Sequence, residues 1–548
     1  MAAGLGKRSQ TPSEPYAGRW VARLQGQVVG QGGTPRQSLH AARASRAKEA
    51  PQVEWMPGAM KPSLPPLVER VRAVLPTDQE LYLVGGAVRD LLLEKPSHDF
   101  DFVSPGKAIA TARRVANALG AAFYPLDESR DVGRVILTEG LEHATLDFIA
   151  LQGADIDSDL AARDLTINAM AIDLRHPEAL LDPLGGATDL TARRVRACSP
   201  DAFRADPVRV LRAIRMAASF DMKIDKATRQ ALRDAASRLP QVSAERLRDE
   251  LFRLLQAPKL ATSLRALDLL SALVPILPEL AALKGVEQSA PHAFDVWSHT
   301  LQVVNKLDHL MSLLGENYRP EGAGNLHSGL VVLRLGRYRS QIGELLGQEL
   351  VPGRSRRELL MFAALFHDAG KPATRSVEAE GRVRFIGHDQ VGAELVVARG
   401  EALHLSNAEI DYLGMVVGRH GRPYALTQSG EVPSPRAIYR FFRQTGEWGV
   451  DICLLSLADF MGKTGVDLSQ DALAEHLETL RILLEAYFEK REQTIAPSPL
   501  LNGDDLIKEL RLEPSPKIGE ILESLREAQA TGEIHTRADA LALAKSLL

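Results

Sequence analysis

Two acidic side chains two residues apart, Asp99 and Asp101, are the first candidates for chemistry in this chain. They lie in the segment HDFDFV, whose polar and apolar residues alternate with period two and predict a β-strand. Alternate residues of a strand point to one face of the sheet, so both carboxylates share a face. Two such carboxylates offer the oxygen ligands that Mg²⁺ requires, and paired metal ions drive in-line phosphoryl transfer.

A glycine pair just before these acids is suited to binding phosphate. The predicted strand LYLVGG ends at Gly85 and Gly86, whose missing Cβ atoms let backbone N–H groups approach phosphate oxygens. Arg89 follows three residues later as a charged partner for a triphosphate. A lone DxD pair is common on protein surfaces, whereas the order strand, glycine pair, arginine, helix and DxD is specific.

Further segments continue this pattern toward residue 260. They are ARDLTINAMAIDL (162–174), DPLGGATDL (182–190), RADPVRVLRAIRMAASF (204–220) and SAERLRDELFRLL (243–255). Their types and order resemble the motifs of the class II tRNA nucleotidyltransferase and bacterial poly(A) polymerase family, within the polymerase-β superfamily. The resemblance covers about residues 67–260 and implies a nucleotidyltransferase head.

The resemblance also implies a role for each polar residue. Asp99 and Asp101 would hold Mg²⁺, and Asp147 on a later strand is either a third acid beside the metals or a structural acid. Asp164 would pair with a neighbouring arginine and organise its motif. The residues expected to bind the nucleotide are Gly85, Gly86, Arg89, Arg163, Asn168, Asp206, Arg209, Arg212 and Arg215.

The last four of these residues recur every three positions, which predicts one face of a helix over 206–216. An aspartate accepts hydrogen bonds and an arginine donates them. Cytosine and adenine both present an amine donor beside a ring-nitrogen acceptor, so an Asp206–Arg209 pair would accept C and A and reject G and U. The alternative is an arginine-rich helix that faces solvent or RNA phosphate. The family usually has an acid immediately before this aspartate, where this chain has Ala205.

A second constellation of histidine and aspartate lies in the later half of the chain. It resembles the HD-domain signature of metal-dependent phosphohydrolases, and its residues are His299, His367, Asp368, His388, His420 and Asp459. The additional His388 and His420 suit a site with two metals, for which Ni²⁺ or Mn²⁺ is expected, and Lys371 could assist with phosphate. A metal there would activate water toward a phosphomonoester or cyclic phosphodiester. The alternative is a helical domain that keeps this fold without its chemistry.

The composition of the chain limits the class of protein to which it can belong. Hydrophobic residues make up 45% and charged residues 25%, as in ordinary globular proteins. No stretch approaches 18 consecutive apolar residues, and the first 18 residues lack a hydrophobic segment, so we expect a cytoplasmic protein without a membrane span. The net charge of −4 requires any RNA site to be a local patch. Two cysteines, Cys198 and Cys453, cannot form a disulfide framework or a four-cysteine zinc site.

The expected fold class is α+β: a polymerase-β-like head with a mixed sheet and helices, followed by a long all-α body with an HD-type helical domain. Residues 1–60 are expected to form a basic appendage and linker, either a small βα unit with a helix near 38–48 or an unstructured leader. The proline-rich segment 51–66 is expected to be linker. The other expected domains are the head (67–200), a helical nucleobase-selecting and RNA-binding neck (201–285), the HD-type domain (286–495) and a helical tail (496–548).

The resemblance implies template-independent addition of CCA to tRNA 3′ ends from CTP and ATP. Tail residue Gly519 is predicted near a helix start, where N–H groups either bind RNA phosphate or merely pack. Within the class, a poly(A) polymerase and a CC-only or A-only enzyme stay open. From another class, an HD phosphohydrolase with an RNA-binding head stays open. The oligomeric state is unknown from the sequence.

Overall fold

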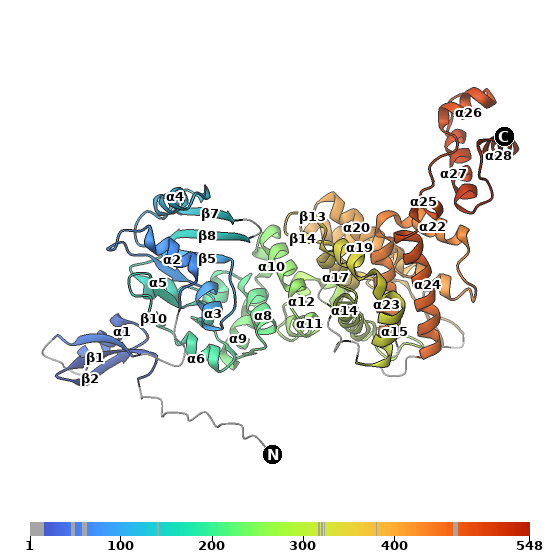
Figure 1. The fold of residues 1–548 in the computed structure, drawn as a ribbon. Coiled ribbons are helices and arrows are strands. Elements are labelled where there is room, and N and C mark those ends of the chain that lie inside the picture. Colours follow the sequence, from blue (N-terminus) through green and yellow to red (C-terminus); the bar gives the residue numbers. More distant parts are fainter. Residues whose placement is uncertain are drawn as a thin grey trace, which may run out of the picture. The chain divides into compact units, whose positions relative to one another are not determined.

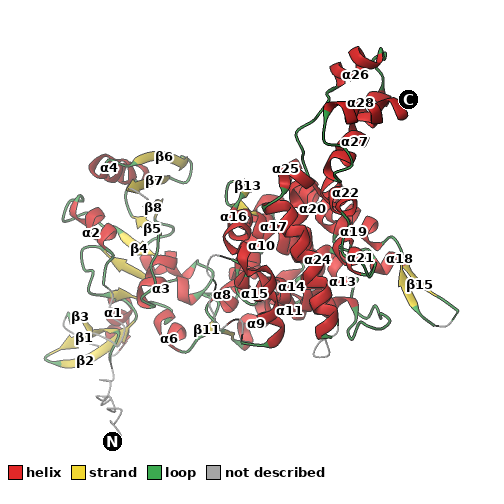
Figure 2. Ribbon diagram, turned by 45° about the vertical axis from the view of Figure 1, so that its right-hand side comes forward, coloured by secondary structure: helices red, strands yellow, loops and turns green. Residues whose placement is uncertain are grey.

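The protein is described here by a computed structural model that covers residues 16–44, 50–56, 63–139, 142–315, 318, 322, 324–379, 381–463 and 469–548. Internal contacts divide the chain into two compact units, Met1–Arg238 and Leu239–Leu548. Strands lie mainly in the first unit, and helices dominate the second (Figures 1 and 2).

A seven-stranded mixed sheet forms the centre of the first unit, as predicted for the head. Its strand order is β10-β9-β4-β5-β8-β7-β6, with β5 and β8 parallel and the other neighbours antiparallel. The strands are β4 (Tyr82–Val84), β5 (Asp99–Ser104), β6 (Ala122–Asp127), β7 (Val132–Glu139), β8 (Glu142–Ala150), β9 (Ala171–Asp173) and β10 (Leu180–Leu181).

Alternation along β5 separates a packed face from a polar one. Phe100 and Phe102 are buried, and Phe102 stacks on Phe148 of β8 with ring centroids 4.9 Å apart. Helix α4 (Ala108–Leu119) packs on β7 and β8 through a face of small residues, including Ala112 and Val115 (Figure 1). Asp99 and Asp101 are therefore left on the same, opposite face, as period two requires.

A small antiparallel sheet precedes the head. It has the order β2-β1-β3, and its elements are β1 (Arg19–Leu24), β2 (Gln27–Gly32), α1 (Pro35–Ala44) and β3 (Gln52–Met56). The two predicted strands are present, but the helix begins at Pro35 rather than near residue 38, because proline is favoured at the first helical position. Part of its expected end, residues 45–49, lies outside the described residues. The expectation of a linker over 51–66 was wrong for residues 52–56, which form strand β3. The prolines on either side of this strand are typical of a linker and gave the wrong prediction.

The helix predicted over 206–216 begins later than expected. Helix α8 spans Arg209–Ser219, and Asp206 lies between α7 (Ala202–Ala205) and α8 in an extended conformation, with φ −146° and ψ 94°. Pro207 explains the difference, because a proline disfavours the helical conformation of the residue before it. Asp206 is therefore not on the helix that carries the three arginines.

The remaining elements of the first unit connect the head motifs. They are α2 (Pro66–Ala73), α3 (Gly86–Leu92), α5 (Ile156–Ala161), α6 (Gly186–Thr191), β11 (Arg194–Val195), β12 (Lys223–Ile224) and α9 (Lys226–Ala236).

The second unit is mainly helical, as predicted for the body, but it begins at Leu239, whereas the body was expected from residue 201. Two short hairpins in this unit were not predicted from the sequence. They are β13–β14 (Glu349–Val351, Arg354–Ser355) and β15–β16 (Arg375–Val377, Val383–Phe385). Its longer helices are α10 (Ala244–Gln256), α11 (Leu260–Leu269), α14 (Val296–Leu313), α15 (Leu326–Leu335), α16 (Arg339–Gly347), α17 (Arg356–Phe366), α19 (His388–Ala402), α20 (Asn407–Arg419), α22 (Pro435–Thr445), α23 (Gly449–Gly462), α24 (Gln470–Phe488), α26 (Gly503–Leu510), α27 (Pro516–Ala530) and α28 (Arg537–Ser546). Its shorter helices are α12 (Leu273–Ile276), α13 (Pro278–Ala281), α18 (Lys371–Thr374), α21 (Arg422–Thr427) and α25 (Arg491–Thr494).

The C-terminal helices have a hydrophobic core of their own. Leu506, Ile521 and Leu525 lie in this cluster, which joins α26, α27 and α28. Gly519 lies in the first turn of α27, as predicted. Both cysteines are free thiols, and among the described residues no helix is long and apolar enough to span a membrane.

A buried ion pair links two helices of the body. Arg356 at the start of α17 pairs with Asp451 of α23, and both are about 1% exposed. The Tyr412 hydroxyl donates to Asp451 Oδ1 over 2.9 Å, and the Arg356 guanidinium lies 4.8 Å from the Trp448 ring centroid. Burial raises the pKa of Asp451, while Arg356 partly offsets this effect.

Replacing Arg356 with methionine leaves the Asp451 carboxylate buried without its cation. We expect Arg356→Met to lower the free energy of unfolding of the body by about 3 kcal/mol, since breaking one side of a buried pair is costly. Urea denaturation followed by tryptophan fluorescence measures it. Arg334→Gln, which breaks an exposed pair with Glu478, should cost less than about 1 kcal/mol. Equal losses in both variants would contradict the buried-pair assignment.

Candidate functional sites

A polar cavity of about 290 Å³ in the head collects most of the residues predicted to bind nucleotide. Separate segments of the chain contribute to it: the turn after β4, strand β5, the 163–168 motif and helix α8. Its lining residues are Gly85, Gly86, Arg89, Asp101, Arg163, Asp164, Asn168, Arg209, Arg212, Arg215 and Met216. The structure thus brings together residues up to 131 positions apart in a pocket rich in arginine.

The turn after β4 depends on Gly85. Its φ of +76° is a conformation that favours glycine. A Cβ atom at this position would lie 3.3 Å from both Arg163 Nη1 and Asp101 Oδ2. The bare backbone of Gly85 therefore lies between the cationic and the acidic sides of the cavity, where a phosphate can approach it.

Three carboxylates meet at the middle of the sheet. Asp99 and Asp101 lie on β5, and the parallel register places Asp101 opposite Asp147 of β8. Both oxygens of Asp147 accept from Arg134 of β7, each over 2.7 Å. Burial raises the pKa of Asp101 and the charges of Asp147 and Asp99 raise it further, against the lowering effect of Arg163. Such oxygen donors with unfavourable mutual charge fit a hard divalent cation.

Arg89 is held firmly within the protein. Its Nε and Nη2 donate to the Asp90 carboxylate at 2.9 Å, and Nη1 donates to Asn168 Oδ1 at 2.7 Å. Its guanidinium also lies 4.4 Å from the Phe220 ring centroid. Arg89 therefore lines the cavity and fixes Asn168 in it, with most of its donors already engaged.

Ion pairs fix three more arginines of the cavity, Arg163, Arg209 and Arg212. Arg163 donates through Nε and Nη2 to Asp159, each over 3.2 Å. Arg212 Nη1 lies 3.3 Å from Asp164 Oδ2, which confirms that Asp164 pairs with a neighbouring arginine. Asp206 pairs with Arg209 Nε at 3.6 Å.

Several supporting residues of the head are not predicted from the sequence. Asp90 follows directly after Arg89, which it binds, and Asp159 lies four positions before its partner Arg163. Their spacing in the sequence could therefore have indicated both pairs. No local spacing indicates Arg134 or Phe220. Arg134 reaches Asp147 only through the pairing of β7 with β8, and Phe220 reaches Arg89 only through the placement of its helix.

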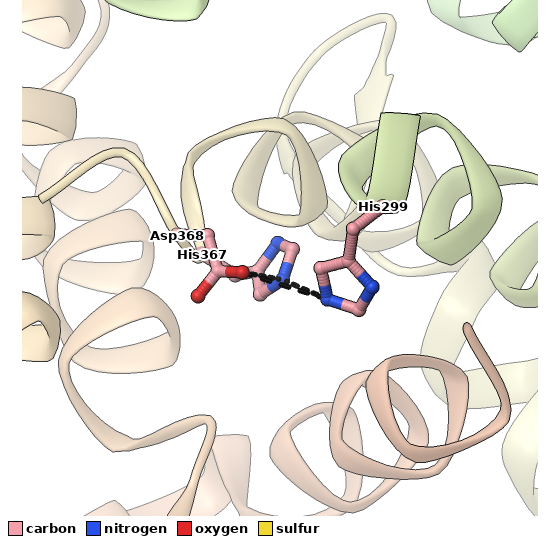
Figure 3. A group of neighbouring side chains, drawn as sticks. All are labelled: His299, His367 and Asp368. Carbon is pink, nitrogen blue, oxygen red and sulfur yellow. Dashed lines mark hydrogen bonds and ion pairs between the residues drawn. The ribbon is translucent and has the colours of Figure 1, made fainter. Parts of the chain in front are cut away.

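The second constellation forms a buried cluster in the helical body (Figure 3). His299 comes from α14, His367 and Asp368 follow α17, and Asp459 lies on α23. His299 Nε2 lies 3.0 Å from Asp459 Oδ1 and 3.5 Å from Asp368 Oδ2, and His367 Nε2 lies 3.2 Å from Asp368 Oδ2. All four side chains converge on one point.

His388 and His420 extend the cluster on the other side of Asp368. His388 Nε2 lies 3.6 Å from Asp368 Oδ1, and the ligand atoms of Asp368, His388 and His420 lie within 4.8 Å of one another. A second group with this spacing consists of His299, His367 and Asp368. Asp368 belongs to both groups, so its two oxygens suit a bridging position.

Each histidine of the cluster has the same backbone contact. Nδ1 lies 2.8 Å from the carbonyl oxygen three residues earlier in His367, His388 and His420, and 3.3 Å from the Gly462 oxygen in His299. A ring that donates from Nδ1 to a carbonyl has its Nε2 lone pair free for a metal, which is the usual arrangement of metal-binding histidines. The donor set therefore fits divalent ions.

Two lysines balance the charge of the acids. Lys371 Nζ lies 2.7 Å from Asp368, and Lys463 Nζ lies 3.1 Å from Asp459. Burial would raise the pKa of Asp368, but the charges of His367 and Lys371 hold it well below its usual range. Burial lowers the pKa of His420 to about 4, so this ring is neutral at physiological pH.

A cavity of about 410 Å³ opens onto this cluster. Its lining includes Asp368, His388, His420, Asp459, Lys371 and Lys463, together with Arg382, Arg384, Phe385 and Tyr424. Asp368, His388, His420, Asp459 and Lys371 are predicted from the sequence, whereas Lys463 is not, although it follows Asp459 by four positions. The arginines and Phe385 come from the unpredicted hairpin β15–β16.

Four family models match the chain. A poly(A) polymerase head domain matches residues 81–196, and a probable RNA- and SrmB-binding site of polymerase A matches 221–284. An HD domain matches 326–449, and a putative tRNA nucleotidyltransferase domain 2 matches 454–544.

Curated relatives extend the similarity over most of the chain. An A-adding tRNA nucleotidyltransferase of Deinococcus radiodurans is 34% identical over 84% of this chain and 94% of that protein. The chain belongs to the tRNA nucleotidyltransferase family. A CC-adding member from Geobacter sulfurreducens is also 34% identical, over 84% of this chain and 90% of that protein, and one from Thermus thermophilus is 32% identical, over 85% and 93%.

Solved structures share the fold of this nucleotidyltransferase. A CCA-adding enzyme in an apo form covers 88% of this chain and 92% of its own, with a TM-score of 0.56 and 19% identity. The Thermotoga maritima CCA-adding enzyme in complex with tRNA covers 89% and 97%, with a TM-score of 0.51 and 19% identity. The polymerase-β-like head and the helical body with an HD domain are thus established. Nucleotidyltransferase and HD domains generally need divalent metal ions.

Proposed function

We propose that the enzyme completes tRNA 3′ ends with CCA, using CTP and ATP without a nucleic-acid template. The observation that carries the proposal is the head cavity, where Asp101 of the acidic strand β5, a glycine turn and an arginine-bearing helix meet. The matched head and tRNA nucleotidyltransferase domains support it. We also propose that the enzyme acts in the cytoplasm, where tRNA, CTP and ATP occur together.

The chemistry is an in-line displacement at the α-phosphorus. The tRNA 3′-hydroxyl loses its proton to water and forms the new P–O bond, the bond from the α-phosphorus to the oxygen shared with the β-phosphate breaks, and pyrophosphate leaves. Asp99 and Asp101 provide the oxygen ligands for Mg²⁺, with Asp147 beside them as a further acid. Mg²⁺, when bound, lowers the pKa of the attacking hydroxyl and neutralises charge on the triphosphate. The Gly85 turn and Arg163 bind the triphosphate from the other side of the cavity.

Nucleobase choice rests on the Asp206–Arg209 pair and the arginines of α8. Arg209 also donates to the carbonyl oxygens of Ala162 and Ala202, each over 3.2 Å, which fixes its position relative to the 163–168 motif. A base that mismatches this fixed pattern leaves buried donors unpaired, at a cost of about 1–3 kcal/mol per group. Protein side chains thus take the place of a template base.

The number of nucleotides added is the finer question within this proposal. Curated relatives that align over 84–85% of this chain are named A-adding and CC-adding enzymes, while others are named multifunctional CCA proteins. A CC-only or A-only enzyme is therefore the second candidate, and the matched poly(A) polymerase head keeps a poly(A) polymerase as the third.

Product length separates these candidates. A tRNA transcript that ends at its discriminator base is incubated with enzyme, Mg²⁺ and labelled CTP, ATP or both, and resolved on a sequencing gel. We expect three added nucleotides, and only with both substrates. Two nucleotides with CTP alone and none afterwards would mean a CC-adding enzyme. An A-adding enzyme would add a single A to a transcript that ends in CC and nothing to the transcript that ends at the discriminator base. A poly(A) polymerase would give a long ladder of products with ATP alone.

Removing one acid tests the metal assignment. Asp101→Asn keeps the size of the side chain but removes a charged oxygen ligand, and we expect nucleotide addition to fall by at least about a hundredfold. Asp234→Asn, which changes an exposed carboxylate on α9, is the matched control and should keep full activity. Single-turnover addition to tRNA measures both variants. Wild-type rates for Asp101→Asn would remove Asp101 from the catalytic site.

For the HD cluster we propose a second activity, hydrolysis of a phosphomonoester or cyclic phosphodiester. The supporting observation is the set of four histidine Nε2 atoms that converge around Asp368 and Asp459 beneath a cavity with cationic walls. Nitrogen-rich sites favour transition metals, so Mn²⁺ or Ni²⁺ is the expected ion. Such ions, when bound, activate water and polarise phosphate. Lys371, Arg382 and Arg384 would bind the phosphate oxygens.

Metal content and hydrolysis test the HD proposal together. The apoenzyme is loaded with Mn²⁺ or Ni²⁺, bound metal is measured by mass spectrometry, and hydrolysis of 2′,3′-cyclic AMP and p-nitrophenyl phosphate is followed. Asp368→Ala should lose bound metal and hydrolysis while nucleotide addition persists. His404→Gln, which alters an exposed histidine paired with Glu245, should change neither. Wild-type protein that retains no transition metal after loading would refute the site.

A further inference from the structure

Residues 19–44 and 52–56 form a small sheet and helix that make specific contacts with the head. We call this segment, β1–β2–α1–β3, the N-terminal clamp. The matched family ranges begin at residue 81, and the motifs of the head do not require it. Its described side chains nevertheless contact two segments on either side of the 163–168 motif in the sequence. These are the start of α5 and residues 180–183.

The first contact is with the start of α5. Thr34 Oγ1 donates to Asp157 Oδ2 over 2.7 Å, and Arg36 forms an ion pair with Asp155. Asp155 is the N-cap of α5 and forms a capping box with Ser158. The clamp thereby fixes the first turn of the helix through two acidic residues that are two positions apart, Asp155 and Asp157.

The second contact is with the segment 180–183. The Asp182 amide donates to the Gly33 carbonyl over 2.8 Å, Gln37 Nε2 donates to the Pro183 carbonyl over 3.0 Å, and Trp20 Nε1 donates to the Leu180 carbonyl over 2.9 Å. A Cβ atom at Gly33 would lie 1.6 Å from the Asp182 carbonyl oxygen. The two backbones meet so closely that only glycine fits at this position.

Both contacted segments continue directly into the nucleotide cavity. The first turn of α5 also carries Asp159, which holds Arg163 through two hydrogen bonds. On the other side, Asp182 accepts from the first amides of α6, and Asp189 of α6 accepts from Thr166 Oγ1 over 2.7 Å. The clamp therefore supports the 163–168 motif from both of its neighbours.

We propose that the N-terminal clamp is a positioning element for nucleotide binding, acting through α5 and Asp159 on Arg163. This inference rests on the proposed function, because it assumes that the cavity binds CTP or ATP. Its residues touch no substrate. They limit the movement of α5, so that the Arg163 guanidinium stays beside the Gly85 turn without an entropic cost at each binding event.

The test weakens the clamp without disturbing the cavity. Thr34→Val keeps the shape of the side chain but loses the hydrogen bond to Asp157, and Arg36→Gln removes the ion pair with Asp155. We expect the double variant to raise the KM and Kd for CTP or ATP by about three- to tenfold, as lost hydrogen bonds of this kind do, with kcat changed less than twofold. Gly33→Val is a stronger disruption of the same interface.

Coupling to Arg163 distinguishes positioning from general stability. In an Arg163→Ala background the clamp substitutions should raise Kd no further, because the residue through which they act is gone. Arg23→Gln is the matched control, since it breaks an ion pair with Glu54 inside the small sheet. It should leave Kd, KM and kcat unchanged.

Calorimetry with CTP and ATP on the full chain separates the outcomes. Wild-type protein that binds neither nucleotide would refute the proposed function itself. Wild-type protein that binds nucleotide, together with clamp variants of equal Kd, would overturn the inference alone. A lower melting temperature with unchanged Kd and KM would likewise overturn it, because the clamp would then be merely structural.

Discussion

Crowding of carboxylates on one face of the head sheet is the constraint around which the rest of the head is organised. The parallel pairing of β5 with β8 places Asp101 opposite Asp147, with Asp99 on the same strand. Like charges this close repel strongly where water is partly excluded. The fold compensates unevenly: Arg134 takes both oxygens of Asp147, whereas Asp101 keeps a raised pKa. The residual negative potential is thus left where a divalent cation would bind.

The same logic explains why the surrounding arginines are themselves paired. An arginine free to collapse onto Asp101 would cancel the field that a metal needs. Arg89 is instead bound to Asp90, and Arg163 to Asp159, so each guanidinium is held at the wall of the cavity. Gly85 completes the arrangement, because any side chain there would occupy the gap between Arg163 and Asp101. The cavity is therefore open and charged rather than closed by its own ion pairs.

Features that depend on local spacing could be predicted from the sequence, and features that depend on long-range pairing could not. The period-two alternation around Asp99, the glycine turn and the His367–Asp368 dipeptide are visible in short windows, and the structure shows the corresponding strand, turn and cluster. Arg134 became meaningful only through the β7–β8 register. The start of α8 was misplaced because Pro207 outweighed the repeat of arginines, and β3 was missed because prolines beside a five-residue strand resemble a linker.

Donor chemistry sets the two centres apart within one chain. The head offers carboxylate oxygens from Asp99, Asp101 and Asp147, which suit a hard ion that keeps part of its water shell. The body instead offers imidazole nitrogens, each oriented by a carbonyl on Nδ1, around the oxygens of Asp368 and Asp459. Borderline transition metals bind such nitrogen more strongly than Mg²⁺ does. The head and the body therefore offer different donor chemistry to divalent ions.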